Sequence, residues 1–185
     1  IISRTNAIKV GTETTYDISN IYINDCKLFM TDLYPGSVSG ISLEACDGTV
    51  LSNVNIDNIT MDRCTCPIFI RLANRNRAAE VNSQSAIEFG KKGKGGADSN
   101  VFRFNMLSEV RDINISNITA TRVELPVIIA GYKQFCITKR VKNVTLKNIF
   151  LDYYACEETV DKRRFIPEYA KTYPEGWRFR NLPSY

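Results

Sequence analysis

A nine-residue pattern that recurs four times constrains the fold of this chain more than any other feature. It reads apolar, any residue, Asn or Asp, apolar, any, apolar, any, Asn or Asp, apolar. The copies begin at residues 18, 51, 110 and 141, so successive starts are 33, 59 and 31 residues apart. Spacings near thirty are typical of a solenoid, in which each repeat forms one coil stacked on its neighbour. The spacing of 59 fits one coil that carries a large insertion.

Both parts of each repeat have the pattern of β-strands. In every copy apolar residues alternate with polar ones, a period of two that favours a strand over a helix. A second short apolar run follows the same spacing, at residues 7–10, 40–44, 67–71 and 126–130. No amphipathic helical pattern lies between these runs. The sequence therefore predicts an all-β fold, a single-stranded parallel β-helix.

This repeat predicts one β-helix domain that takes in residues 1–185. An insertion at about 73–105 carries six Lys and Arg against three Asp and Glu. We expect a solvated loop there, with a lid that attracts an anionic polysaccharide as the alternative. An aromatic segment at about 152–185 follows the last repeat, and packing at a solenoid end is favoured over a sugar-binding role. The chain starts without Met or a signal peptide, so we expect truncation at both ends.

The Asn and Asp residues of the pattern predict a side-chain ladder. Stacked in register at about 4.8 Å, their side chains can hydrogen-bond along the stack and to the turn backbone. This favours a structural role over glycosylation for the Asn-X-Ser/Thr sequences inside the repeats. The ladder residues are Asn20, Asp25, Asn53, Asn58, Asp112, Asn117, Asn143 and Asn148.

Composition excludes several classes of function. The chain has no His, which excludes Ser-His-Asp and Cys-His nucleophiles and leaves proton transfer to carboxylates. A formal net charge of +4 is too small to indicate a nucleic-acid binder. No apolar run approaches the roughly 20 residues of a membrane span. We therefore expect no membrane span, no nucleic-acid partner and no cofactor.

The six cysteines give no zinc-binding pattern. Only Cys64 and Cys66 lie close in sequence, and there is no His to complete a zinc site. On a strand, a Cys-X-Cys pair points both thiols to the same face. Free, buried thiols are the favoured interpretation, and a disulfide is the alternative.

Three stretches of the chain, residues 6–13, 39–48 and 66–75, resemble a known family. They read Asn-Ala-Ile-Lys-Val-Gly-Thr-Glu, Ser-Gly-Ile-Ser-Leu-Glu-Ala-Cys-Asp-Gly and Cys-Pro-Ile-Phe-Ile-Arg-Leu-Ala-Asn-Arg. The chain resembles the polygalacturonase-like glycoside hydrolases of family 28. That resemblance implies a right-handed parallel β-helix, inverting hydrolysis of a pectic polysaccharide, and a secreted or periplasmic protein.

Matching the family's motifs to this sequence reveals departures. The family's His position falls on Asn6, and its Arg-Ile-Lys strand, which binds the uronate carboxylate, falls on Ser42-Leu43-Glu44. Neither cation of that strand is present. The family's aspartate motifs precede the His strand, so we expect the catalytic aspartates outside this chain. An inverting glycosidase needs two such carboxylates about 6.5–9.5 Å apart.

The candidate substrate-binding residues lie on the second set of strands. Alternation points Ile and Leu side chains inward and predicts an exposed outer stripe made of Lys9, Ser42, Glu44, Phe69 and Arg71. Glu44 and Arg71 hold equivalent positions on successive coils, so an ion pair and a sugar-binding role both stay open. The same two interpretations apply to Lys9 and Glu13. The predicted substrate-binding residues are Lys9, Glu13, Ser42, Glu44 and Arg71.

Two other functions compete with a hydrolase. Loss of the His and of the cation pair would fit a non-catalytic carbohydrate-binding or structural β-helix. A pectate-lyase-type eliminase would need clustered carboxylates for calcium, and the predicted stripe has too few.

Overall fold

The computed structural model describes residues 1–12, 14, 16–30, 38–73, 108–134 and 137–153. In this part of the chain every regular element is a β-strand, and the strands of the two principal sheets run parallel. The all-β prediction is therefore confirmed. The predicted insertion at about 73–105 and the aromatic segment at about 152–185 fall almost entirely outside the described residues.

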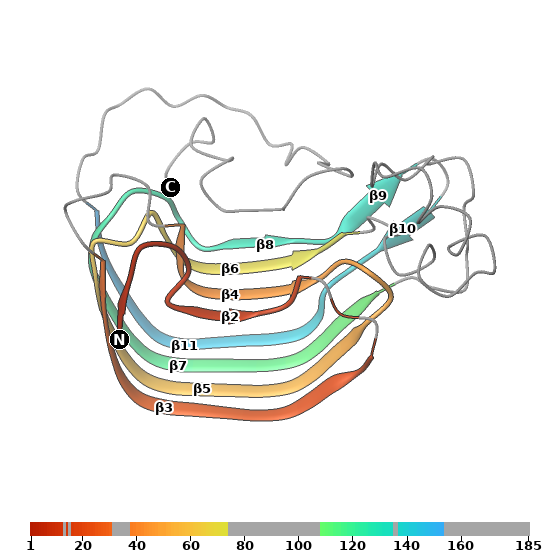
Figure 1. Ribbon diagram of the computed structural model, residues 1–185, viewed down its shortest axis with the longest axis horizontal. Helices are drawn as coiled ribbons and strands as arrows, with labels where there is room; N and C mark the ends of the chain where they lie inside the picture. Colours follow the sequence, from red (N-terminus) through yellow and green to blue (C-terminus); the bar gives the residue numbers. More distant parts are fainter. Residues whose placement is uncertain (13, 15, 31–37, 74–107, 135–136, 154–185) are drawn as a thin grey trace, which may run out of the picture.

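A five-stranded parallel sheet is built from the repeated pattern (Figure 1). Its order is β1-β3-β5-β7-β11, and each copy of the pattern lies in one of the four long strands. The strands are β1 (Ile2–Ser3), β3 (Ile18–Met30), β5 (Val50–Asp62), β7 (Glu109–Val123) and β11 (Lys142–Tyr153).

The second set of apolar runs forms a four-stranded parallel sheet in the order β2-β4-β6-β8. These strands are β2 (Ile8–Val10), β4 (Ser39–Ala45), β6 (Cys66–Leu72) and β8 (Ile128–Ala130). A short antiparallel pair, β9 (Tyr132–Gln134) with β10 (Ile137–Lys139), leads from the small sheet toward β11. The chain thus alternates between the two sheets, as the repeat predicts.

Strand register follows the spacing of the repeat. Ile18 lies opposite Leu51, and Leu51 lies opposite Val110, so equivalent positions of successive copies are neighbours. The same holds in the small sheet, where Glu44 is the partner of Arg71. A shift by one residue would turn the apolar side chains of a strand to the solvent, which is why the pattern fixes the register.

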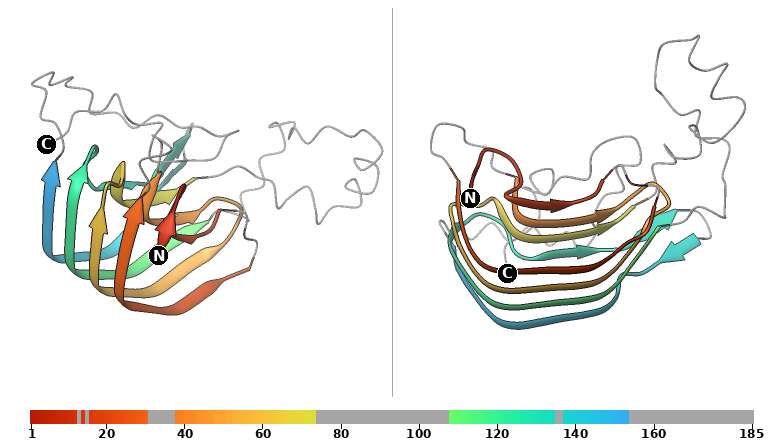
Figure 2. Two further views of the ribbon diagram at one scale, coloured as in Figure 1. Left: turned by 60° about the vertical axis from the view of Figure 1, so that its left-hand side comes forward. Right: turned by 60° about the horizontal axis from the view of Figure 1, so that its bottom comes forward.

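The main core lies between the two sheets (Figure 2). Its centre consists of fully buried aliphatic side chains from both, among them Ile41, Ile68, Ile56 and Ile113. Burying one such side chain is worth roughly 1.5–3 kcal/mol, so the stacked rows stabilise the pairing of the sheets.

Each long strand bends at residues in the left-handed conformation. In the described part of the chain ten non-glycine residues have φ between 51° and 62°, and eight of them are the Asn and Asp residues of the pattern. That conformation costs an ordinary L-residue roughly 1–2 kcal/mol, and Asn and Asp tolerate it best. The other two, Arg63 and Arg122, form a third corner that the pattern did not predict.

The predicted ladder is confirmed at both corners. Asn53 Nδ2 donates to Asn20 Oδ1 over 2.6 Å, and Asn58 Nδ2 donates to Asp25 Oδ1 over 2.6 Å. Further along the second stack, Asn148 Nδ2 donates to Asn117 Oδ1 over 2.9 Å. Side-chain amides therefore link successive strands outside the backbone ladder.

One prediction about the cysteines is wrong. Cys64 and Cys66 are free and buried, as expected, but they do not share a face. Cys64 belongs to the main core, whereas Cys66 belongs to a second cluster on the other side of the small sheet. The rule of alternation fails because β6 begins only at Cys66, after the left-handed corner at Arg63.

Candidate functional site

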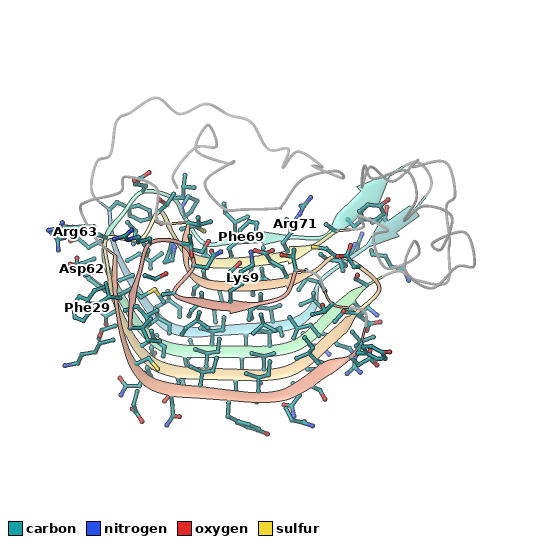
Figure 3. All side chains as sticks on the ribbon, in the orientation of Figure 1. Lys9, Phe29, Asp62, Arg63, Phe69 and Arg71 are labelled. Atoms are coloured by element: carbon teal, nitrogen blue, oxygen red, sulfur yellow. The ribbon has the colours of Figure 1, made fainter. Side chains whose placement is uncertain are left out.

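The candidate site is the face of the small sheet that points away from the main core. Lys9 of β2, Ser42 of β4 and Phe69 of β6 lie in one row of the register, and Glu44 and Arg71 lie in the next. Figure 3 shows Lys9, Phe69 and Arg71 on the upper side of these strands. The structure thus brings together four of the five predicted binding residues. Glu13 lies outside the described residues.

The centre of this group is the carboxylate of Glu44. Its Oε1 accepts a hydrogen bond from Ser42 Oγ over 2.5 Å and lies 3.3 Å from Lys9 Nζ. The Glu44 side chain is fully buried, whereas the Lys9 side chain is 23% exposed. Burying a carboxylate is costly unless it is paired and hydrogen-bonded, so the contacts with Lys9 and Ser42 offset that cost and fix the orientation of the group.

Arg71 extends the group toward β8. Its side chain is buried, and Nη1 donates to the carbonyl oxygen of Gly131 over 3.3 Å. Because the register places Arg71 beside Glu44, two cationic side chains flank one carboxylate on this face. The predicted adjacency of Glu44 and Arg71 is confirmed.

The expected exposure of the stripe is wrong. Ser42, Glu44, Phe69 and Arg71 are each at most 1% exposed, and only Lys9 reaches the solvent. Alternation correctly sends these side chains away from the main core, but this face carries a second apolar cluster. Phe69 packs there with Cys66, Leu125, Ile128 and Ala130. A period of two identifies the face of a strand and cannot tell whether that face is covered.

A turn after β2 closes over Glu44. Gly11 has φ of +102°, and a Cβ built on it would lie 2.0 Å from the Glu44 carbonyl oxygen. Only glycine fits this close approach of two backbones. At the other end of β2, Asn6, which falls on the His position of the family that the sequence resembles, is half-buried, and its carbonyl oxygen accepts a hydrogen bond from Ser3 Oγ. Asn6 and Gly11 thus bracket the strand that carries Lys9.

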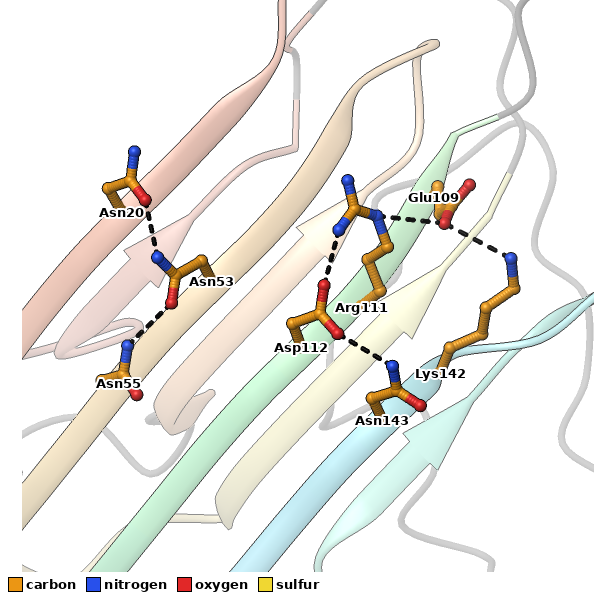
Figure 4. A network of polar contacts seen from close by, with 8 residues as sticks. All are labelled: Asn20, Asn53, Asn55, Glu109, Arg111, Asp112, Lys142 and Asn143. Atoms are coloured by element: carbon orange, nitrogen blue, oxygen red, sulfur yellow. Dashed lines mark hydrogen bonds and ion pairs between the residues drawn. The ribbon is translucent and has the colours of Figure 1, made fainter.

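Sequence reasoning missed a second polar group, on the outer face of the large sheet (Figure 4). Arg111 lies 3.2 Å from Glu109 and donates to Asp112 Oδ2 over 2.5 Å, while Lys142 lies 3.3 Å from Glu109. Asn143 Nδ2 also donates to Asp112, and these bonds lower the pKa of that carboxyl. The spacing makes Arg111 and Lys142 register partners, but both are cations, so this row gave no sign of an ion pair.

The described residues contain no group of three or more His, Cys, Asp and Glu side chains that could hold a metal ion. No helix among them is long and apolar enough to cross a membrane. Chemically, the site on the small sheet offers one fixed carboxylate, one hydroxyl and two cationic groups.

Comparison of the chain with protein-family models, with curated proteins and with solved structures finds no match.

Proposed function

We propose that this chain is part of a glycoside hydrolase of the polygalacturonase type, acting on a pectic polysaccharide outside the cell or in the periplasm. The observation that carries the proposal is the group of Lys9, Ser42, Glu44 and Arg71 on adjacent parallel strands. In the resembling family the same strands face the polysaccharide. Lys9, the exposed member, contacts substrate directly, and the buried members hold it in position.

The architecture of the proposal is a right-handed parallel β-helix, of which the two sheets form walls. Support comes from the path of the chain, which leaves β2, passes through β3 in the large sheet and returns to β4 beside β2. Connections between parallel strands of one sheet are right-handed in about 98% of cases. The left-handed Asn corners supply the bends that such coils need.

Hydrolysis with inversion requires a carboxylic acid at the leaving oxygen and a carboxylate that activates water. In this proposal neither is Glu44, because Lys9 and Ser42 already bind its Oε1 and the side chain is buried. The two acids are supplied from outside residues 1–185. The chain's own contribution is to bind and orient the sugar next to them.

The burial of Ser42, Glu44 and Arg71 favours a second function. A buried ionic group on the outer face of a sheet can simply hold a segment against that face. In that case the protein is a non-catalytic carbohydrate-binding or structural β-helix, and the group has no contact with substrate.

One experiment separates the two functions. Reducing-sugar release is measured from homogalacturonan, rhamnogalacturonan and a neutral pectic side chain, with a protein that contains this chain and its preceding coils. We expect hydrolysis of one of these polymers, and a Lys9→Met variant should raise KM with little change in kcat, because it removes binding made equally in ground and transition states.

Lys27→Met is the matched control, since Lys27 is exposed on the large sheet and away from the site. Hydrolysis with identical KM for both variants would place the Lys9 group outside the substrate path. Absence of hydrolysis with all three polymers would leave the binding or structural function as the better description.

A further inference from the structure

A groove on the outer face of the large sheet has no role in the proposed hydrolase. It has a volume of about 410 Å³, within the range of about 300–1,000 Å³ found for ligand sites. The groove follows the second Asn corner across β5, β7 and β11. Its lining residues are Asn58, Asn117, Ile118, Thr119, Asn148, Ile149 and Phe150.

The polar side of the groove keeps unused hydrogen-bonding capacity. Each amide of the stack spends one N–H on the ladder: Asn58 on Asp25, Asn117 on Asp57, and Asn148 on Asn117. A side-chain amide has two N–H donors, so within the part of the chain that the structure describes a second donor is left on each. The exposed hydroxyl of Thr119 makes no hydrogen bond within the described part of the chain. The ladder thus fixes a row of oriented donors in place.

The apolar side of the groove is the ring of Phe150. This side chain is 61% exposed. It lies in the same register row as Thr119, whose hydroxyl is also exposed. Covering an aromatic ring of this size with a ligand is favourable, and the face of the ring packs well on aliphatic C–H groups. Ring and amide row therefore offer one apolar surface beside one polar edge.

The charge around the groove disfavours an anion. None of its lining residues is charged. Behind the amide row, however, lie the carboxylates of Asp25 and Asp57, which accept the hydrogen bonds of Asn58 and Asn117. The hydrogen bond from Ser116 and that from Asn117, with a smaller contribution from the Asn58 backbone, lower the pKa of Asp57, so its charge persists to acidic pH. These two carboxylates would repel an acidic ligand, and Lys147, exposed on β11 as the register partner of Ser116, offsets only part of that repulsion.

We propose that this groove binds a neutral saccharide chain, whose C–H face covers Phe150 and whose hydroxyls bond to the Asn row and Thr119. A saccharide combines an apolar face with a dense set of donors and acceptors, which is the combination that the groove offers. Successive strands of the sheet lie about 4.8 Å apart, so donors repeat along the groove at a short, regular interval. The site is separate from the Lys9 group and does not depend on the proposed hydrolysis.

The test is a titration followed by amide chemical shifts in two-dimensional NMR spectra. The probes are galactotetraose and arabinotetraose as neutral saccharides and tetragalacturonate as the acidic one, each up to about 10 mM. We expect saturable shifts at residues 117–119 and 148–150 with at least one neutral probe. Tetragalacturonate should bind there at least about tenfold more weakly.

Variants identify the contacts. Phe150→Ala should weaken binding at least about tenfold, and Thr119→Val should weaken it by a smaller factor, whereas Phe150→Trp should retain it. Phe29→Ala is the matched control, because Phe29 is also a phenylalanine exposed on this sheet but lies on β3, outside the groove. The expected result for the control is unchanged affinity.

Three results would overturn the proposal. They are no shifts at these residues with either neutral probe, equal binding of tetragalacturonate, and equal loss of binding in the Phe29→Ala and Phe150→Ala variants. Both phenylalanines are exposed, so their replacement leaves the core intact, and the dispersion of the amide spectrum reports this directly.

Discussion

Replacement of Asn53 tests how much the corner ladder contributes to stability. Asn53 has φ of 51°, donates to Asn20 over 2.6 Å and accepts from Asn55 over 3.1 Å. In Asn53→Ala the left-handed backbone costs about 1–2 kcal/mol. The two lost hydrogen bonds add about 1 kcal/mol together, because this corner is only half-buried. The expected loss of unfolding free energy is about 2–3 kcal/mol.

Two further variants separate the backbone from the side chain. Asn53→Gly removes the same hydrogen bonds but adopts positive φ freely, so it should lose about 1.5 kcal/mol, including the entropy cost of glycine. Asn114→Ala removes one ladder bond, to Asn55 over 3.1 Å, from a position with ordinary strand backbone. Its expected loss is about 0.5 kcal/mol.

The measurement is urea unfolding at equilibrium, with a common slope fitted to all variants. For a slope of about 2 kcal/mol per molar urea, Asn53→Ala should move the midpoint down by about 1 M. The loss of unfolding free energy should be largest for Asn53→Ala, smaller for Asn53→Gly and smallest for Asn114→Ala. Equal losses for Ala and Gly at position 53 would refute the argument that left-handed backbone is a main cost at the corner.

Three other predictions follow from single contacts. The Gly11→Ala variant should yield little soluble, folded protein, because its Cβ would lie 2.0 Å from the Glu44 carbonyl oxygen. Yield and thermal melting measure this, and a melting temperature within a few degrees of wild type would contradict it. The pKa of Asp57 is lowered from 3.8 by side-chain hydrogen bonds, so its contribution to stability is present at neutral pH and is lost as pH falls through the lowered folded value; urea unfolding from pH 6 to 3 should show a shallower pH dependence in Asp57→Asn. Burial raises the pKa of Cys64 to about 12 and raises that of Cys66, so peptide mapping should find both unalkylated by iodoacetamide at pH 8 in the native protein and alkylated in urea.

Most of the fold follows from the sequence because two of its rules are local and repeat. Alternation of apolar residues identifies the strands, and the spacing of 33 residues sets Ile18 opposite Leu51 without any structural information. Asn and Asp mark the first two corners because they tolerate positive φ. Arg63 and Arg122 hold the third corner without such a preference, so no propensity indicates it.

The candidate site was predictable in its composition but not in its environment. Register alone makes Glu44 and Arg71 neighbours. The diagonal contact from Lys9 to Glu44 depends on side-chain length and rotamer, which spacing does not specify. Phe69 on this face packs with Leu125, which precedes the run at 126–130, and with Ile128 and Ala130 of that run. The repeat therefore identifies this face, whereas its burial depends on contacts that the spacing does not specify.

The third corner shows how a residue without left-handed preference is held there. Arg122 Nε donates to Asp62 Oδ1 over 2.7 Å, its guanidinium also pairs with Oδ2, and Thr121 Oγ1 donates to Oδ1 over 3.1 Å. The backbone of Arg63 adds a bond to the Thr121 carbonyl oxygen over 3.0 Å. An exposed ion pair is worth only about 0–1 kcal/mol, less than the roughly 1–2 kcal/mol cost of the backbone. The bidentate geometry and the two further hydrogen bonds are therefore needed together, and charge at this corner replaces the amide ladder of the other two.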